Sequence, residues 1–108
     1  MSANVKKHMT ILKKLSKSST RDQRKLLRSS PRELIDALSE ITVNVLNGRI
    51  RLTPEEIHKL KRYNSRLLRI SKKSTPIAEK RRIIQRGGFL SVLLPAAIAV
   101  ITSLVSSI

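Results

Sequence analysis

The feature that most constrains this chain is the separation of its charged residues from its most apolar stretch. All 23 lysines and arginines and all seven aspartates and glutamates lie between Lys6 and Arg86. The segment Phe89–Ile108 contains no ionisable side chain and follows Gly87-Gly88. The sequence therefore predicts a cationic body and an apolar end that need different environments.

The composition indicates a binding protein rather than an enzyme. A chain of 108 residues allows one small domain, and its formal net charge of +16 opposes compaction by self-repulsion. Without cysteine it has no disulfide framework and no thiolate metal site. Two histidines and seven scattered carboxylates form no candidate catalytic or metal cluster. We therefore expect no catalytic residues, no metal and no cofactor, and a polyanion as partner.

Four short motifs predict the starts of helices. Ser30-Pro31-Arg32-Glu33 and Thr53-Pro54-Glu55-Glu56 are typical of capping boxes with proline at the first helical position. Thr75-Pro76 opens a third helix, and Thr20-Arg21-Asp22-Gln23 is a fourth candidate box, without proline. Because no strand alternation of any length accompanies them, the predicted fold class is all-α.

An antiparallel helix hairpin is the expected framework of a small helical domain. The first helix carries apolar residues at helical spacing, at Leu34, Ile35, Leu38, Ile41, Val45 and Leu46, and Asn47-Gly48 predicts its left-handed end. The second is expected to run from Pro54 to about Lys73, with its stripe at Ile57, Leu60, Leu67 and Leu68. The connection between them is short, which favours antiparallel packing. Leu26 and Leu27 indicate a shorter covering helix.

The chain is expected to divide into four segments. Residues 1–19 form a basic amphipathic segment whose apolar face holds Val5, Met9, Leu12 and Leu15, and which we expect to be helical only when bound to a partner. Residues 20–73 form the small helical domain, and residues 74–88 a basic helix ending in Gly-Gly. Residues 89–108 form a hydrophobic C-terminal helix or tail that is transmembrane, membrane-active or docked on a partner.

Two basic clusters are the candidate nucleic-acid-binding residues. The first is Lys59, Lys61, Arg62, Arg66, Arg69, Lys72 and Lys73, and the second is Lys80, Arg81, Arg82 and Arg86. A charged helix face is often merely solvated, but here the bases outnumber the acids more than three to one. Two aromatic residues cannot build a stacking platform, and Asn64 is most simply a surface residue. We expect binding to phosphates without sequence readout, with double-stranded DNA as the partner. His8 and His58 are expected at the surface or at a boundary.

The apolar tail has two interpretations. Twenty helical residues reach about 30 Å, the thickness of a bilayer's hydrocarbon core. The membrane-contacting residues would then be Phe89, Leu90, Val92, Leu93, Leu94, Ile98, Val100, Ile101, Leu104, Val105 and Ile108. The alternative function is thus a membrane-active or tail-anchored protein whose basic part faces the cytosol and attracts an anionic membrane. Pro95 interrupts such a helix, and a buried core helix or a docking segment of an assembly protein remains open.

Gly87-Gly88 also has two interpretations. In the first interpretation, the two glycines end the helix and form a hinge. A thin, extended Gly-Gly can also enter a narrow protease active site. Cleavage after Gly88 would release a hydrophobic peptide that begins at Phe89.

With these residues identified, the chain resembles the small basic proteins of adenovirus-related elements, the Polinton/Maverick and adintovirus group. The resemblance rests on NVLNGRIRLTPEEIHKLKRY (Asn44 to Tyr63), on KRRIIQRGGFL (Lys80 to Leu90) and on the apolar tail. Those proteins are similar to the precursor of adenovirus core protein X (mu), a DNA-condensing virion component. The resemblance implies a viral core protein, with capsid proteins as further partners and a viral cysteine protease that cuts after Gly88. Gln85 departs from the Met, Ile or Leu that the adenovirus protease prefers at this place.

The expected location follows from the same features. The N-terminus lacks the continuous apolar core of a secretory signal peptide, which favours an intracellular protein. The resemblance implies a virion core or a host nucleus. A retained tail would place the protein at a membrane.

Overall fold

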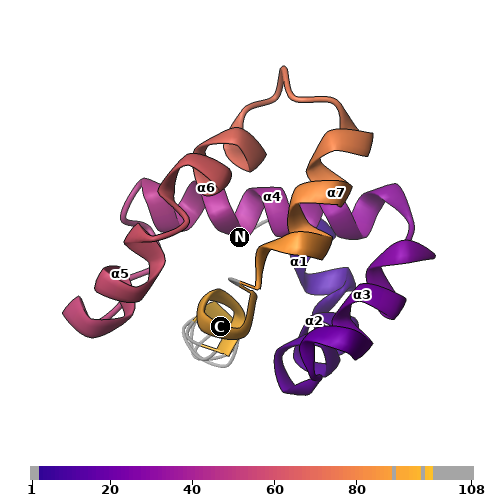
Figure 1. Cartoon of the computed structure of the whole chain (residues 1–108), viewed down its shortest axis with the longest axis horizontal. Helices are drawn as coiled ribbons and strands as arrows, with labels where there is room; N and C mark the ends of the chain where they lie inside the picture. The colour runs from indigo at the N-terminus through magenta and orange to yellow at the C-terminus, as the bar shows by residue number, and fades with distance from the viewer. Residues whose placement is uncertain (1–2, 89, 96, 99–108) are drawn as a thin grey trace.

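Helix α4 (Arg32–Leu46) lies at the centre of the fold and supplies five fully buried apolar side chains. The structure, a computed structural model, describes residues 3–88, 90–95 and 97–98. Within those ranges every regular element is helical, so the predicted all-α class is confirmed. Figure 1 shows α4 crossing the molecule behind α6 and α7, with α5 at one end and α2 and α3 at the other.

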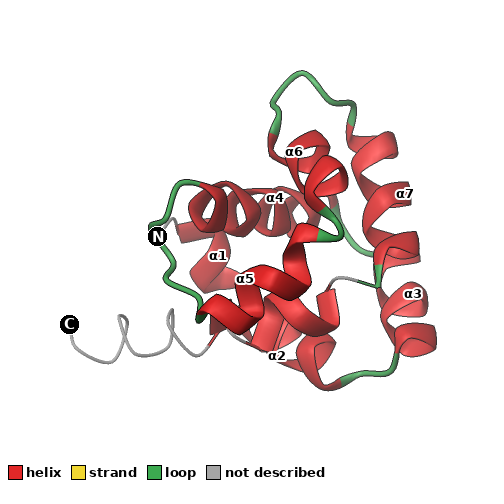
Figure 2. Ribbon diagram, turned by 60° about the vertical axis from the view of Figure 1, so that its left-hand side comes forward, coloured by secondary structure: helices red, strands yellow, loops and turns green. Residues whose placement is uncertain are grey.

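The remaining helices are short. They are α1 (Ala3–Lys7), α2 (Met9–Lys17), α3 (Thr20–Arg28), α5 (Pro54–Lys61), α6 (Asn64–Ser71) and α7 (Ile77–Gly87), followed by helical residues at 90–95 and 97–98. Helices α1, α6 and α7 all pack against α4, and α3 packs against α7. Figure 2 shows α7 with α6 alongside it and α3 near its C-terminal end. The radius of gyration of 12.7 Å is that of a compact chain of this length.

The first four residues of the apolar stripe predicted for α4 form the core, whereas Val45 is half-buried and Leu46 is exposed. Leu34, Ile35, Leu38 and Ile41 are all at most 1% exposed. The helix ends where Asn47-Gly48 predicted, because Gly48 has a φ of 72°, a left-handed conformation that costs glycine little.

The N-terminal segment is part of this core, so its predicted dependence on a partner is wrong. Val5, Leu12 and Leu15 are fully buried in the same cluster as the α4 side chains. Burial of these residues against the rest of the fold supplies the apolar contact that an isolated amphipathic helix lacks. His8 between α1 and α2 is also buried, at 8% exposure, whereas His58 is exposed.

The single helix predicted from Pro54 to Lys73 is also wrong, because the chain forms two helices. Tyr63, with φ −109° and ψ 15°, leaves the helical region, and its N–H donates to the carbonyl of Leu60 at 2.9 Å, a tighter i→i−3 bond. This break lets α6 bury Leu67 and Ile70, while Ile57 on α5 stays 46% exposed. The second helix of the predicted hairpin is thus replaced by α5 and α6, and it is α6 that packs on α4.

A helix begins at each of the four predicted starts, at Thr20, Arg32, Pro54 and Ile77, but only one capping box is confirmed as predicted. Thr53 caps α5 in a full capping box, accepting from the Glu56 N–H while the Glu56 carboxylate accepts from the Thr53 N–H. At the other three starts, either the hydroxyl that was predicted to cap the helix donates to a backbone carbonyl instead, or a different residue caps the helix. Ser30 Oγ and Thr75 Oγ1 donate to the carbonyls of Leu27 and Arg69, respectively. Helix α3 is capped one residue early, with Asp22 N–H donating to Ser19.

The described part of the apolar segment folds back into the core. Leu90, Leu93, Leu94 and Ala97 are at most 1% exposed and belong to the same cluster as Val5. Core side chains therefore come from both sides of Gly87-Gly88. The outer part of the tail predicted as a C-terminal helix, residues 99–108, lies outside the described residues.

Candidate nucleic-acid interface

Basic residues are unevenly distributed among the helices. Between Asn64 and Gly88, the stretch that forms α6 and α7, the sequence holds eight bases and one acid. Helix α4 has the opposite balance, with Arg32 against three acids. Residues 6–28, which form most of α1 to α3, hold nine bases and one acid, so the excess positive charge lies on α1–α3 as well as on the neighbouring helices α6 and α7, and not on α4.

All members of the first predicted cluster are exposed. They occupy α5, the turn between α5 and α6, α6 itself and the turn that follows α6, at Lys59, Lys61, Arg62, Arg66, Arg69, Lys72 and Lys73. Lys59 lies 3.8 Å from the Glu55 carboxylate, an exposed i,i+4 pair that is worth little. The break at Tyr63 divides the cluster between two helices, so these residues do not form one straight row.

The second predicted cluster is divided between the interior and the surface. Lys80 is only 7% exposed, and burial lowers the pKa of its amine, partly offset by the Asp36 carboxylate. Arg81 is half-buried, whereas Arg82 and Arg86 are exposed. This alternation follows from the helix, since residues one apart lie on different faces and residues four apart share one.

Arg81 fixes α7 to the junction of α3 and α4. Its Nη1 donates to the carbonyls of Leu27 and Ser30 at 2.7 and 2.8 Å, and to the Ser30 hydroxyl at 2.8 Å. A guanidinium that closes the end of a helix satisfies carbonyls that have no partner within the helix. Arg81 therefore holds the fold together at this junction.

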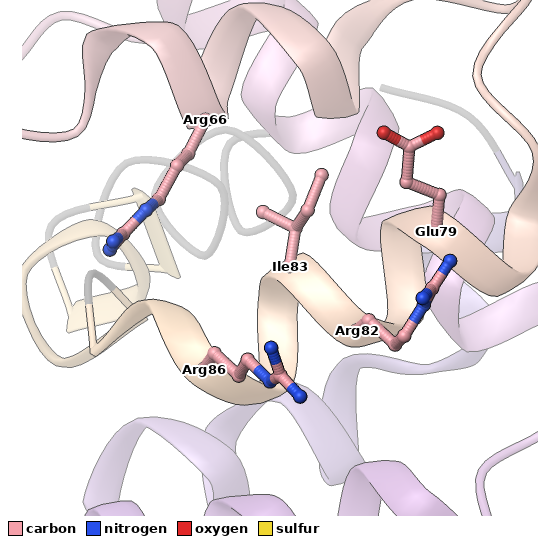
Figure 3. Close-up of a pocket in the computed structure, with 5 residues that line it drawn as sticks. All are labelled: Arg66, Glu79, Arg82, Ile83 and Arg86. Carbon is pink, nitrogen blue, oxygen red and sulfur yellow. The ribbon is translucent and has the colours of Figure 1, made fainter.

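Arg82 and Arg86 line a cleft between α6 and α7, which we call the α6–α7 cleft. It has a volume of about 390 Å³ and is lined by Arg66, Glu79, Arg82, Ile83 and Arg86. Figure 3 shows Arg66 extending from α6 and Ile83 pointing from α7 into the space between the helices, with Arg82 and Arg86 on successive turns of α7. Three guanidinium groups thus surround one apolar side chain and one carboxylate.

The carboxylate in this cleft is already paired. Glu79 accepts from Arg69 Nε at 2.7 Å and from Nη2 at 3.0 Å, a two-pronged ion pair between α7 and α6. Its hydrogen bonds with Arg69 and the nearby Arg82 charge keep the pKa of Glu79 below its ordinary value, and the same pair raises the pKa of Arg69. The single acid of the α6–α7 region is therefore largely neutralised by a residue that does not line the cleft.

A second cleft lies on the other side of α7, and the sequence did not predict it. This α3–α7 cleft has a volume of about 400 Å³ and is lined by Arg24, Arg28, Gln85 and Arg86. Arg24 Nε donates to the backbone carbonyl of Gln85 at 3.2 Å, across 61 positions of sequence. The four-residue spacing of Arg24 and Arg28 places them on one face of α3, but no local pattern connects that face with α7.

The predicted cleavage site lies at the end of α7. Gly87 is the last helical residue, and Gly88 follows in a left-handed conformation with a φ of 70°. The helix-stop interpretation of the two glycines is therefore confirmed. Phe89 lies outside the described residues.

The predicted membrane residues divide between the core and the part of the chain that the structure does not describe. Leu90, Leu93, Leu94 and Ile98 are buried and Val92 is half-buried. The others, Phe89, Val100, Ile101, Leu104, Val105 and Ile108, lie outside the described residues. Among the described helices, none combines the length and the apolar character required to cross a bilayer.

Comparison with known proteins identifies no relative. No protein-family model, curated protein or solved structure gives a significant match to this chain.

Proposed function

We propose that this protein binds double-stranded nucleic acid through its phosphate backbone, without reading the base sequence, and condenses it. The observation that carries the proposal is the pair of arginine-lined clefts on either side of α7, whose single lining acid, Glu79, is already paired. Guanidinium groups bind phosphate oxygens well, and neutralised phosphates release condensed counterions.

The lack of sequence readout follows from what the surface offers. Base recognition in the major groove relies on a presented helix whose side chains reach base edges, and single-strand recognition relies on aromatic stacking. The whole chain contains one tyrosine, one phenylalanine and no tryptophan, and Tyr63 is half-buried. Positively charged side chains without such readers fix a protein on the backbone and carry no sequence information.

The amount of charge supports condensation as well as binding. Duplex DNA carries one phosphate charge per about 1.7 Å, so sixteen positive charges match about 27 Å of duplex. The net charge of the chain is +16, and the molecule measures 34 Å along its longest axis. A contiguous layer of this protein would thus neutralise most of the duplex that it covers, which removes the repulsion between neighbouring duplexes. A structural role in packaging a genome, as the sequence resemblance implied, is the proposed biological setting.

Fluorescence anisotropy with two labelled duplexes of unrelated sequence tests the proposal. We expect equal affinities for the two, and a logarithm of the binding constant that falls linearly with the logarithm of salt concentration. Light scattering at charge-matched ratios should report condensation. Absence of binding at low salt, affinity indifferent to salt, or a strong preference for one sequence would each contradict the proposal.

A further inference from the structure

Helix α7 separates two clefts that share a lining residue. Arg86 lines both the α6–α7 cleft and the α3–α7 cleft, so the two sites meet at the C-terminal turn of α7. Each has about 400 Å³ of space, against about 30 Å³ for one water molecule in the liquid. A phosphate group with part of its hydration shell fits either one.

The cationic residues that line these clefts are all of one kind. They are Arg24, Arg28, Arg66, Arg82 and Arg86, and no lysine lines either cleft. The chain as a whole has eleven lysines and twelve arginines, so a lining without lysine is not simply a result of composition. The two side chains carry the same charge, but only the planar guanidinium presents a fork of donors that matches two phosphate oxygens.

Neighbouring groups position two of these arginines. Arg24 is tied through its Nε to the Gln85 carbonyl, which leaves both of its terminal amino groups as further donors. The Arg66 guanidinium carbon lies 5.9 Å from the centre of the Tyr63 ring, a cation–π contact. Side chains that are ordered before binding lose less rotamer freedom when the ligand arrives.

Charge within the clefts also favours an anion. Arg82 and Arg86 have no ion-pair partner among the described residues, and the Glu79 carboxylate of the α6–α7 cleft is held by Arg69. Arg69 therefore prevents the one local acid from competing fully with an incoming phosphate. The α3–α7 cleft contains no acid at all among its lining residues.

We infer that the two clefts hold phosphate groups of a nucleic-acid backbone that crosses α7 at Arg86, through forked arginine contacts rather than diffuse charge. The inference rests on the proposed function and specifies the part of the surface and the chemistry by which it acts. The exposed lysines of α5 and of the turn after α6 then add long-range attraction, which any cation could supply.

Charge-preserving substitutions test this inference on the full chain. The double variant Arg82→Lys, Arg86→Lys keeps the net charge but removes two of the three guanidinium forks of the α6–α7 cleft and the shared one of the α3–α7 cleft. The matched control is Arg21→Lys, Arg51→Lys, since both residues are exposed, belong to neither predicted cluster and line neither cleft. Affinity for a labelled duplex and its salt dependence are measured for each, with thermal unfolding to show that each variant is folded.

We expect the cleft variant to lose on the order of tenfold in affinity with an unchanged salt slope, because charge-assisted forked contacts are lost while the charge remains. The control should stay within about twofold of the wild type. Equal affinities of both variants would overturn the inference and leave the proposed function intact. A wild-type protein that does not bind the duplex would instead reject the proposed function itself.

A second experiment measures binding of the same two variants to vesicles of phosphatidylcholine with phosphatidylserine. Lipid headgroups also carry phosphates, whereas we infer that the phosphates bound in the clefts belong to nucleic acid. The cleft variant and the control should bind these vesicles equally. If the cleft variant lost affinity for the vesicles and not for the duplex, the clefts would be lipid sites and the inference would be wrong.

Discussion

The two basic clusters of this chain look alike in sequence and differ in the structure. The seven basic residues from Lys59 to Lys73 are all exposed, and a break at Tyr63 divides them between α5, α6 and the turns that follow these helices. Between Lys80 and Arg86, one cation is buried, one is tied to backbone carbonyls, and two line clefts. The difference shows that a count of cations measures attraction to a polyanion, whereas helix packing decides which cations are available for direct contact.

The most destabilising substitution is expected in the apolar segment that follows α7. Leu93, which follows the second cluster, is fully buried in the shared core. Leu93→Ala should lower the free energy of unfolding by about 2–5 kcal/mol, because it removes buried methyl groups and leaves a cavity. Urea titration of the full chain measures this, with half-buried Val92→Ala as the milder control. A change below about 1 kcal/mol would mean that the apolar segment is not in the core in solution.

Within the second cluster, Arg81 and Arg82 should contribute differently to stability. Arg81→Ala should cost about 1.5–3 kcal/mol of unfolding free energy, because charge-assisted hydrogen bonds to the Leu27 and Ser30 carbonyls are lost. The next residue provides the control, since Arg82→Ala removes an exposed side chain and should change stability by no more than about 0.5 kcal/mol. Similar losses for both variants in chemical denaturation would show that the two arginines have the same role.

The burial of Lys80 should make the stability of the protein depend on pH in the alkaline range. Its folded-state pKa is lowered below the ordinary 10.5, so the unfolded chain holds the proton more tightly. The cost of the buried charge is complete at neutral pH, and stability should rise as pH increases from the lowered pKa towards 10.5. Lys80→Met should remove this alkaline rise without loss of stability at neutral pH. Thermal unfolding across this pH range checks it, with exposed Lys72→Met as a control that keeps the wild-type pH profile.

Glu79 should give the smallest effect on stability and an informative one on binding. Its pKa is lowered by Arg69, so the stabilisation is complete above the ordinary value of 4.5 and is lost as pH falls through the lower folded-state pKa. In Glu79→Gln this loss of stability at acid pH should be smaller than in the wild type, which thermal unfolding at a series of acid pH values measures. At neutral pH Glu79→Gln should also tighten duplex binding slightly, because one negative charge leaves the α6–α7 cleft. Weaker binding would show that the Arg69–Glu79 pair orders the cleft.

Local patterns predicted much of the framework. The α4 stripe and its end at Gly48 follow from helical periodicity and from a residue that tolerates a positive φ, and the Thr53 capping box follows from chemistry within four residues. The fold class and the apolar face of the N-terminal segment were also predicted from the sequence. The same pattern did not show that this segment packs in the core without a partner.

The clefts were not predictable by the same means. The α3–α7 cleft depends on α3 meeting α7, a contact between residues about sixty positions apart that no short motif specifies, and the α6–α7 cleft depends on how α6 packs beside α7. Nor does the run Lys80-Arg81-Arg82 show which cation turns inward, because that depends on where α4 and the α3–α4 junction lie. The apolar segment was equally ambiguous, since an uncharged run suits a bilayer and a protein core alike.

The most direct test of the account removes the same amount of charge from each cluster. Arg82→Gln, Arg86→Gln and Lys72→Gln, Lys73→Gln each remove two exposed cations, and the affinity of each double variant for a labelled duplex is measured at one moderate salt concentration. We predict that the arginine variant loses on the order of tenfold more affinity than the lysine variant, because it loses direct phosphate contacts as well as attraction. Equal losses would contradict the account and assign binding to net charge alone.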